Sequence, residues 1–337
     1  MRTRLSVVLL ALGISALVVN GFYWLSDRAN QTAPPRNQPP PAKPQTNGIS
    51  GANVRGNRPD KKQAVGPAPT TVTAAASTGS ASIDLPSAAI AAMETGLSSE
   101  SVEIIYRFLL SRELPPGMSA QKTYVIKNDI LNRLRTMDNP PASLTQTMLD
   151  LYQDLEQEAV IRSCALHHMA LWYERNRMRQ DSGDAPPFAT QSDLQHMRAA
   201  MHESLAETDS GIAGTALLAQ LYLSETFAEF DRKELRDSAL SIARNPQRGS
   251  PARSAALQVC ARLGTLEILP TAVDLANKGN SVALRTIALA TVGDLGGKQE
   301  MEFVRTFTTS SNPRLKTAAV LALQRMAKRL GQPDSQS

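Results

Sequence analysis

The sequence predicts an all-α protein: a right-handed α-solenoid of helical hairpins that follows an N-terminal transmembrane helix and a disordered linker. Three observations predict this fold. From residue 98 onward apolar residues recur at helical spacing, no stretch alternates in the way of a strand, and the last third of the chain repeats itself. Of the 337 residues 42% are hydrophobic but only 4% are aromatic, which favours helices that pack closely through small side chains.

The first segment, residues 1–25, is predicted to anchor the chain in a membrane. Residues 5–25 (LSVVLLALGISALVVNGFYWL) contain no charged side chain and are long enough to cross a bilayer core of about 30 Å. Arginines precede this run and an aromatic cluster ends it, so we expect a single-pass inner or plasma membrane protein with a cytoplasmic N-terminus and a periplasmic or otherwise extracytoplasmic C-terminal domain. A cleaved signal peptide is the alternative, although no A-x-A cleavage site is present.

A disordered linker is predicted for residues 26–97. This segment holds ten of the 21 prolines, and residues 70–82 are almost wholly Thr, Ala, Ser and Gly. Such a composition lacks the apolar face that would offset the entropy of ordering the chain, and it is typical of a tether. A short helix is expected within it at Ala88–Thr95. A second disordered segment, the tail 332–337, is predicted at the other end.

The remaining residues, 98–331, are predicted to form about twelve amphipathic helices of ordinary length. Proline and glycine clusters separate the apolar runs. In the last third, the blocks that begin at Arg253, Arg285 and Lys316 align with one another, and their starts lie 32 and 31 residues apart. Shorter helices are expected between the blocks, at about 268–278 and 298–309. One hairpin cannot bury its apolar face alone, so stacking of successive hairpins is predicted.

The repeats carry a recognisable pattern. The motif S-P-x-R-x-x-A at 250–256 recurs as N-P-x-x-K-x-x-A at 312–319, and leucine–glycine hinges follow at 263–264 and 295–296. These residues resemble HEAT repeats, closest to the short bacterial type that also occurs in phycobilisome lyase subunits. The resemblance is good over 250–331 and weaker over 158–224. It implies protein binding along a curved surface, and no catalytic residue comes with it.

The basic residue that opens each repeat forms a predicted ladder of Arg253, Arg285 and Lys316. We interpret the ladder as structural, because a repeated basic position in a solenoid commonly ties neighbouring units together. Ligand binding is the alternative interpretation.

One group of side chains could bind a metal ion. Cys164, His167 and His168 lie at i, i+3 and i+4 of a predicted helix, so they share a face and could supply three ligands to zinc or copper. His196 and His202 could approach from the next helix. The alternative is structural: Cys164 is a small buried hydrophobe, one histidine faces solvent, and the other is hydrogen-bonded near Tyr173. No second metal motif, Walker A, G-x-S-x-G or dinucleotide fingerprint is present, so no cofactor is expected.

Three further features are interpreted as structural. Cys164 and Cys260 belong to helices several units apart, so separate buried thiols are predicted rather than a disulfide. The acidic clusters at 150–158 and 225–234 are predicted to be salt-bridged, solvated helix faces. The basic run of Arg175, Arg177 and Arg179 suits the C-terminal end of a helix, with an acidic partner as the alternative.

The distribution of charge along the sequence argues against a function in nucleic-acid binding. The net charge of +5 lies entirely in the first 97 residues, whereas residues 98–337 contain 27 basic and 27 acidic side chains. A neutral folded domain makes nucleic acid an unsuitable partner. The sequence therefore predicts a non-enzymatic, membrane-anchored extracytoplasmic scaffold that binds other proteins, with the membrane contact through residues 5–25. The alternative is a metal-binding or enzymatic helical domain that uses Cys164, His167 and His168.

Overall fold

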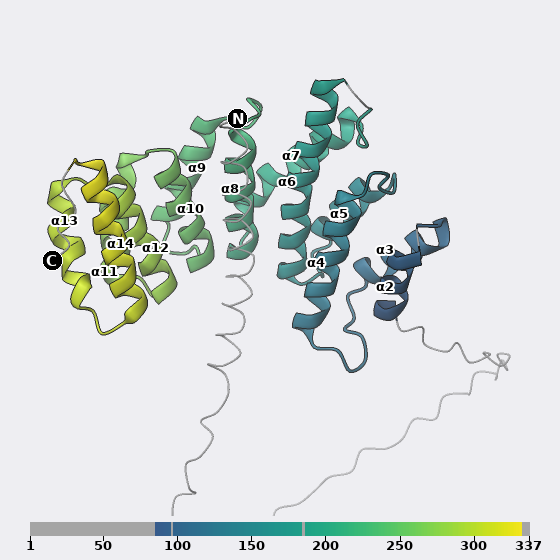
Figure 1. The fold of residues 1–337 in the computed structure, drawn as a ribbon, viewed down its shortest axis with the longest axis horizontal. Coiled ribbons are helices and arrows are strands. Elements are labelled where there is room, and N and C mark those ends of the chain that lie inside the picture. Colours follow the sequence, from purple (N-terminus) through teal and green to yellow (C-terminus); the bar gives the residue numbers. More distant parts are fainter. Residues whose placement is uncertain (1–84, 96, 184–185, 332–337) are drawn as a thin grey trace, which may run out of the picture. The chain divides into compact units, whose positions relative to one another are not determined.

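The computed structural model describes residues 85–95, 97–183 and 186–331. Within these ranges the chain forms thirteen α-helices and three short 3-10 helices, and no strand (Figure 1). The all-α prediction is therefore confirmed for the described part. The predicted anchor at 1–25, most of the predicted linker and the tail at 332–337 lie outside the described residues. None of the described helices is both long enough and apolar enough to cross a bilayer.

The described helices follow one another along the chain with short connections. In order, they are α2 (Leu85–Thr95), α3 (Ser99–Leu110), α4 (Ala120–Thr136), α5 (Leu144–Gln153), α6 (Ala159–Ser182), α7 (Gln191–Glu203), η1 (Ser204–Ala206), α8 (Ser210–Ser224), α9 (Arg232–Arg244), α10 (Ser250–Arg262), η2 (Leu266–Ile268), α11 (Leu269–Lys278), α12 (Val282–Leu295), α13 (Lys298–Arg305), η3 (Thr306–Thr309) and α14 (Pro313–Arg329).

The even-numbered helices form one continuous row. Each of them packs against the next even helix, from α2 through α4, α6, α8, α10 and α12 to α14 (Figure 1). The odd-numbered helices pack on this row rather than mainly on one another. This alternation is the helical-repeat arrangement that the sequence predicts for its last third, and it extends upstream through helices whose spacing in the sequence is irregular.

Helix boundaries follow local chemistry. The side chain of Thr190 accepts a hydrogen bond from the backbone of Asp193, whose carboxylate accepts one from the backbone of Thr190, which makes a capping box at the start of α7. Prolines occupy the first turns of α10 and α14. Gly183 ends α6 with φ = 68°, a left-handed conformation that glycine adopts without strain.

Small residues set the spacing of the even row, as the composition predicts. Gly293 of α12 lies so close to α14 that a Cβ atom placed on it would be 2.7 Å from both Cα and Cβ of Ala322. Gly214 of α8 faces Ala255 of α10 in a looser version of the same contact, at 3.4 Å. Close approach of helix backbones thus depends on glycine and alanine at particular positions.

The folded part begins earlier than predicted. Helix α2 lies within the segment assigned to the linker, yet it packs against α3. Ala89, Ala92 and Met93 of α2 are buried in the same core as the other helices. The short helix expected at Ala88–Thr95 is thus present, and it packs with the helices that follow the predicted boundary at residue 97, because alanine-rich sequence with few large apolar residues still buries a helix face when another helix covers it.

Candidate functional site

The arginines of the predicted ladder hold helices together. The Nε atom of Arg253 donates to the carbonyl of Ala243 at 3.0 Å, and Nε of Arg285 donates to the carbonyl of Ala276 at 2.9 Å. Each arginine is the fourth residue of an even helix, and each acceptor lies in the last turn of the odd helix before it. Carbonyls there lack intrahelical partners, so a cation stabilises them. Lys316 is exposed and makes no such contact with the described residues.

Sequence reasoning missed a further member of this set. Arg162 is the fourth residue of α6, its Nε atom donates to the carbonyl of Tyr152 at 2.8 Å, and its guanidinium pairs with Glu207 at 2.5 Å. With only 6% of its surface exposed, it is the most deeply buried of these arginines. Its position as the fourth residue of an even helix could have identified Arg162, but that position can be assigned only when the start of α6 is known.

The candidate metal ligands Cys164, His167 and His168 all lie on α6. Among the described residues, no group of three or more His, Cys, Asp or Glu side chains is arranged to hold a metal ion. The two histidine rings are 5.3 Å apart, and Nε2 of His168 lies 3.1 Å from Oδ1 of Asn128 on α4. His196 and His202 remain exposed on α7. The hydrogen-bond partner of the buried histidine is thus Asn128 rather than a group near Tyr173.

Burial fixes the protonation states around these residues. Desolvation lowers the pKa of His167 to about 4, with the nearby Arg135 adding to the effect, and it lowers that of His168 well below its usual range. Burial likewise raises the pKa of Cys164 and of Cys260 to about 12. Both cysteines are free, buried thiols, which confirms the prediction that they do not form a disulfide.

The basic run at the end of α6 is engaged within the chain. Arg175 donates to the carbonyl of Arg135, and Nε of Arg177 pairs with Glu229 at 3.2 Å. Arg179 lies over the ring of Phe188, 4.1 Å from its centroid. These contacts favour the structural interpretation of the run.

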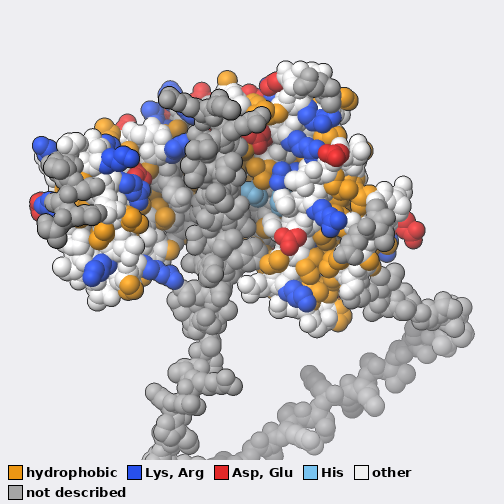
Figure 2. Space-filling view, viewed as in Figure 1, with side chains coloured by type: hydrophobic (Ala, Val, Ile, Leu, Met, Phe, Trp, Pro, Cys, Tyr) orange, Lys and Arg blue, Asp and Glu red, His pale blue; other side chains and the backbone are white. Residues whose placement is uncertain are grey.

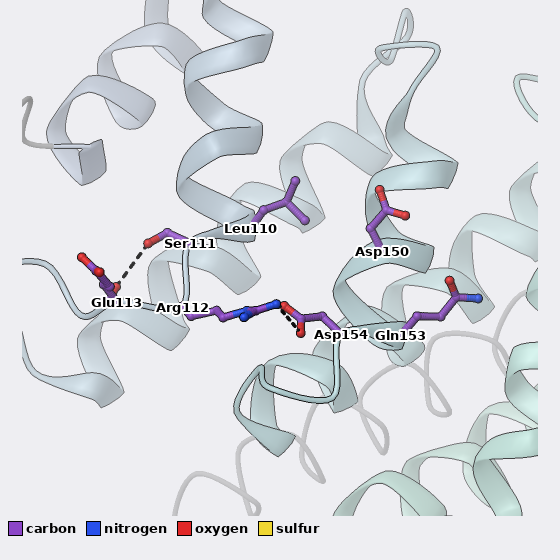
Figure 3. Close-up of a pocket in the computed structure, with 7 residues that line it drawn as sticks. All are labelled: Leu110, Ser111, Arg112, Glu113, Asp150, Gln153 and Asp154. Atoms are coloured by element: carbon purple, nitrogen blue, oxygen red, sulfur yellow. Dashed lines mark hydrogen bonds and ion pairs between the residues drawn. The ribbon is translucent and has the colours of Figure 1, made fainter.

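A first surface depression lies between the end of α3 and the end of α5 (Figure 3). Its lining residues are Leu110, Ser111, Arg112, Glu113, Asp150, Gln153 and Asp154. Arg112 reaches across to Asp154 and donates from Nε at 2.8 Å and from Nη2 at 2.9 Å, and it also contacts Glu156. The hydrogen bonds from Arg112 hold the pKa of the Asp154 carboxyl below its usual range. Arg112 is thus paired with carboxylates of the 150–158 cluster, as the predicted salt-bridged face requires, whereas Glu113 and Asp150 form no ion pair with the described residues.

Exposed leucines flank the first depression. Leu110 lines it and is 38% exposed, Leu114 follows the lining residue Glu113 and is 50% exposed, and Leu155 follows Asp154 and is 76% exposed. On the face shown in Figure 2, hydrophobic side chains gather over α4 and α5. Leu155 stands in the sequence within the acidic run DLEQE, where an apolar residue could have drawn attention to this surface.

A second depression lies where the end of α8, the start of α9 and the end of α10 meet. Its lining residues are Leu221, Glu225, Arg232, Lys233, Arg236, Arg262 and Leu263, around a volume of about 500 Å³. Four of these side chains are cationic and one is anionic. The sequence predicts salt-bridged faces here, and the pair of Arg262 with Glu225 at 3.0 Å fits that prediction, but the cations outnumber their partners.

Comparison with known proteins does not assign a family. No family model matches the chain, and no curated protein matches it. Among solved structures, the designed armadillo repeat protein YIII(Dq)4CqI is similar at 12% sequence identity, over 72% of this chain and 99% of that chain, with a TM-score of 0.35. The helical-repeat description therefore rests on the packing of the described helices themselves.

Proposed function

We propose that the protein is a membrane-anchored extracytoplasmic scaffold of HEAT-like helical repeats that binds other proteins and carries out no chemistry of its own. The observation that carries this proposal is the set of three exposed leucines, Leu110, Leu114 and Leu155, around the first depression. Large apolar side chains that cluster at a surface favour association with another protein, since burying them releases ordered water. The Arg112–Asp154 pair holds the rim of this surface in place.

The repeat architecture supports a binding role. A row of stacked helices offers an extended surface, and its stability comes from contacts between neighbouring units rather than from one enclosed site. The ladder arginines stabilise the ends of odd helices, so these cations take a structural role and leave binding to other side chains. Exposed side chains of the helix ends and connecting loops are then free to vary with the partner.

The sequence of the first 97 residues supports the membrane placement. An uncharged run at 5–25 is long enough to span a bilayer, and the proline-rich segment after it would hold the helical domain away from the membrane. The excess positive charge of these residues suits a location at an anionic membrane surface.

Site-specific crosslinking in cells that produce the full chain tests the proposed binding. A photoreactive amino acid in place of Leu155 is expected to yield discrete protein adducts, which mass spectrometry identifies. The additional substitution Leu114→Asp should reduce their yield, because it removes part of the apolar contact. The same photoreactive group in place of Gln324, an exposed residue of α14, is the control. Absence of adducts at position 155, or identical adducts at both positions, would overturn the proposal.

A further inference from the structure

We propose that the second depression binds an acidic segment of the protein partner, with carboxylates on the cations of α9 and α10 and an apolar side chain on the leucines below them. The inference rests on the proposed scaffold function and names the chemistry of one of its partners. It concerns a different surface from the three exposed leucines, so the two can be tested separately.

The cations of the second depression are incompletely paired. Arg262 pairs with Glu225, and Arg236 pairs with its neighbour Asp237 at 2.8 Å. Arg232 donates only from Nε, to the carbonyl of Ser224 at 3.2 Å. Lys233 makes no side-chain hydrogen bond or ion pair with the described residues. Two of the four cations thus have no carboxylate partner, and their donors face solvent.

Of the other acidic groups nearby, Asp231 and Glu229 are engaged elsewhere, whereas Glu267 acts electrostatically on Arg236. The carboxylate of Asp231 accepts hydrogen bonds from the backbone N–H groups of Lys233 and Glu234, which caps the start of α9. Glu229 accepts a hydrogen bond from the hydroxyl of Tyr173 at 2.8 Å and pairs with Arg177. Glu234 is exposed beside the capped turn. The local excess of cations stands out because residues 98–337 are neutral as a whole.

The arginine of the first depression shows what a fully paired cation looks like in the same chain. There Arg112 contacts two carboxylates, and one of them through two hydrogen bonds. In the second depression Arg262 and Arg236 each contact one carboxylate, and Arg232 and Lys233 contact none among the described residues. Guanidinium groups bind carboxylates through paired, charge-assisted hydrogen bonds, so unpaired arginines at a surface suit a partner that supplies carboxylates.

The shape of the second depression suits a peptide rather than a single ion. Its volume of about 500 Å³ accommodates several side chains. Leu221 is buried and Leu263 is half-buried, and both line the depression, so it offers apolar groups as well as cations. A segment that alternates acidic and apolar side chains would satisfy both parts.

The test uses the full chain in a nonionic detergent and a fluorescent glutamate-rich peptide with interspersed leucines, titrated at low ionic strength. We expect saturable binding that weakens with added salt, and much weaker binding of the same peptide with each glutamate replaced by glutamine. The double substitution Lys233→Glu and Arg236→Glu should weaken binding at least about tenfold, because it removes two cations of the depression and adds two like charges that repel the glutamates of the peptide.

A matched control separates this site from a general charge effect. Arg314→Glu with Lys328→Glu changes the net charge equally, on exposed positions of α14 that make no side-chain pairs with the described residues. This variant should bind the peptide like the unchanged chain. Helical circular dichroism checks that both variants are folded.

Three results would overturn the inference: no binding of the acidic peptide, equal weakening by the control variant, or tighter binding of an RNA oligonucleotide than of the peptide. If adducts at position 155 persist while the peptide fails to bind, the inference fails and the scaffold proposal stands. If the peptide binds and position 155 gives no adducts, the scaffold proposal fails at the leucine surface and the acidic-segment site remains.

Discussion

The same contact is made by three arginines that occupy the fourth position of an even helix: Arg162, Arg253 and Arg285. Each guanidinium donates to a carbonyl in the last turn of the preceding odd helix, at 2.8 to 3.0 Å between donor and acceptor atoms. Arg162 differs in being almost fully buried and in pairing with Glu207, whose side chain is itself only 22% exposed. The three contacts are alike in geometry, and we expect them to differ in energy because burial differs.

Replacing Arg162 by methionine is expected to lower the free energy of unfolding by about 3 kcal/mol, because Glu207 and the carbonyl of Tyr152 would lose a buried partner. Urea unfolding of the full chain in detergent measures this. Lys316→Met is the matched control at the same helical position, with an expected change within about 0.5 kcal/mol. Equal effects of the two substitutions would contradict the assigned roles.

The histidines of α6 give stability a defined dependence on pH. His167 has a pKa of about 4 in the folded chain against an ordinary value of 6.5, so the unfolded chain binds more protons between these values. Stability is therefore complete above about pH 6.5 and falls as the pH falls toward 4. At pH 5 the loss from His167 relative to pH 7.5 should be about 2 kcal/mol.

Urea unfolding at pH 7.5 and at pH 5 checks this dependence. His167→Gln should show a smaller loss of stability between the two pH values than the unchanged chain, because glutamine does not bind the proton. His202→Gln, at an exposed position of α7, should leave the loss unchanged. A loss that is the same in all three chains would contradict the burial of a neutral His167.

The sequence predicts the role of a residue where that residue recurs at a regular interval, and misses it where the interval is irregular. Arg253 and Arg285 were predictable, because they recur at a fixed interval. Arg162 was not, because the helices between α6 and α10 differ in length and hide the repeat. The spacing of Cys164, His167 and His168 places them on one face of a helix, but it does not show that His168 contacts Asn128 of α4.

At the scale of helices, the even row depends on close contacts at small residues. Among the described glycines that lie inside even helices, Gly293 has the tightest contact, since a Cβ atom would meet both backbone and side chain of Ala322 on α14. The many small residues of the sequence predict that its helices pack closely, without showing at which positions. The particular role of Gly293 was not predictable, because the same glycine also fits a helix-terminating hinge.

Gly293→Ala is expected to destabilise the chain by about 2 kcal/mol, because α14 would have to move away from α12. Gly214→Ala is the matched comparison, since it also lies within an even helix and faces the next one. Its Cβ would lie 3.3 to 3.5 Å from its neighbours, and the higher helix propensity of alanine offsets that contact, so a change of less than about 1 kcal/mol is expected. Thermal unfolding of both variants gives the difference. A larger loss for Gly214→Ala would contradict the packing described for α12 and α14.

Element boundaries were predictable where capping chemistry is strong. Prolines at the starts of α10 and α14 and the intervening helices near 268–278 and 298–309 appear as expected, with their last or first turns in 3-10 form. Helix α2 was placed in the linker, because its alanines give little apolar contrast. Tertiary packing against α3, which the sequence does not reveal, is what orders it.

At the level of the whole molecule, residues 98–337 are electrically neutral and the proposed anchor and tether carry the net positive charge. The stack is described by the structure, whereas the anchor and tether are inferred from sequence. Chemical labelling of cysteines can test the packing of the helices and the proposed location of the domain in one experiment. Cys164 and Cys260 are buried thiols, so a maleimide reagent should not modify the folded chain.

Labelling of intact cells with a membrane-impermeant maleimide tests both the packed helices and the extracytoplasmic location, with the native chain and the variant Gln324→Cys compared side by side. We expect the native chain to stay unmodified until it is unfolded, and the exposed cysteine at position 324 to be modified before the cells are opened. Modification of the native chain in its folded state would contradict the packed helical stack. Modification of position 324 only after cell lysis would contradict an extracytoplasmic domain.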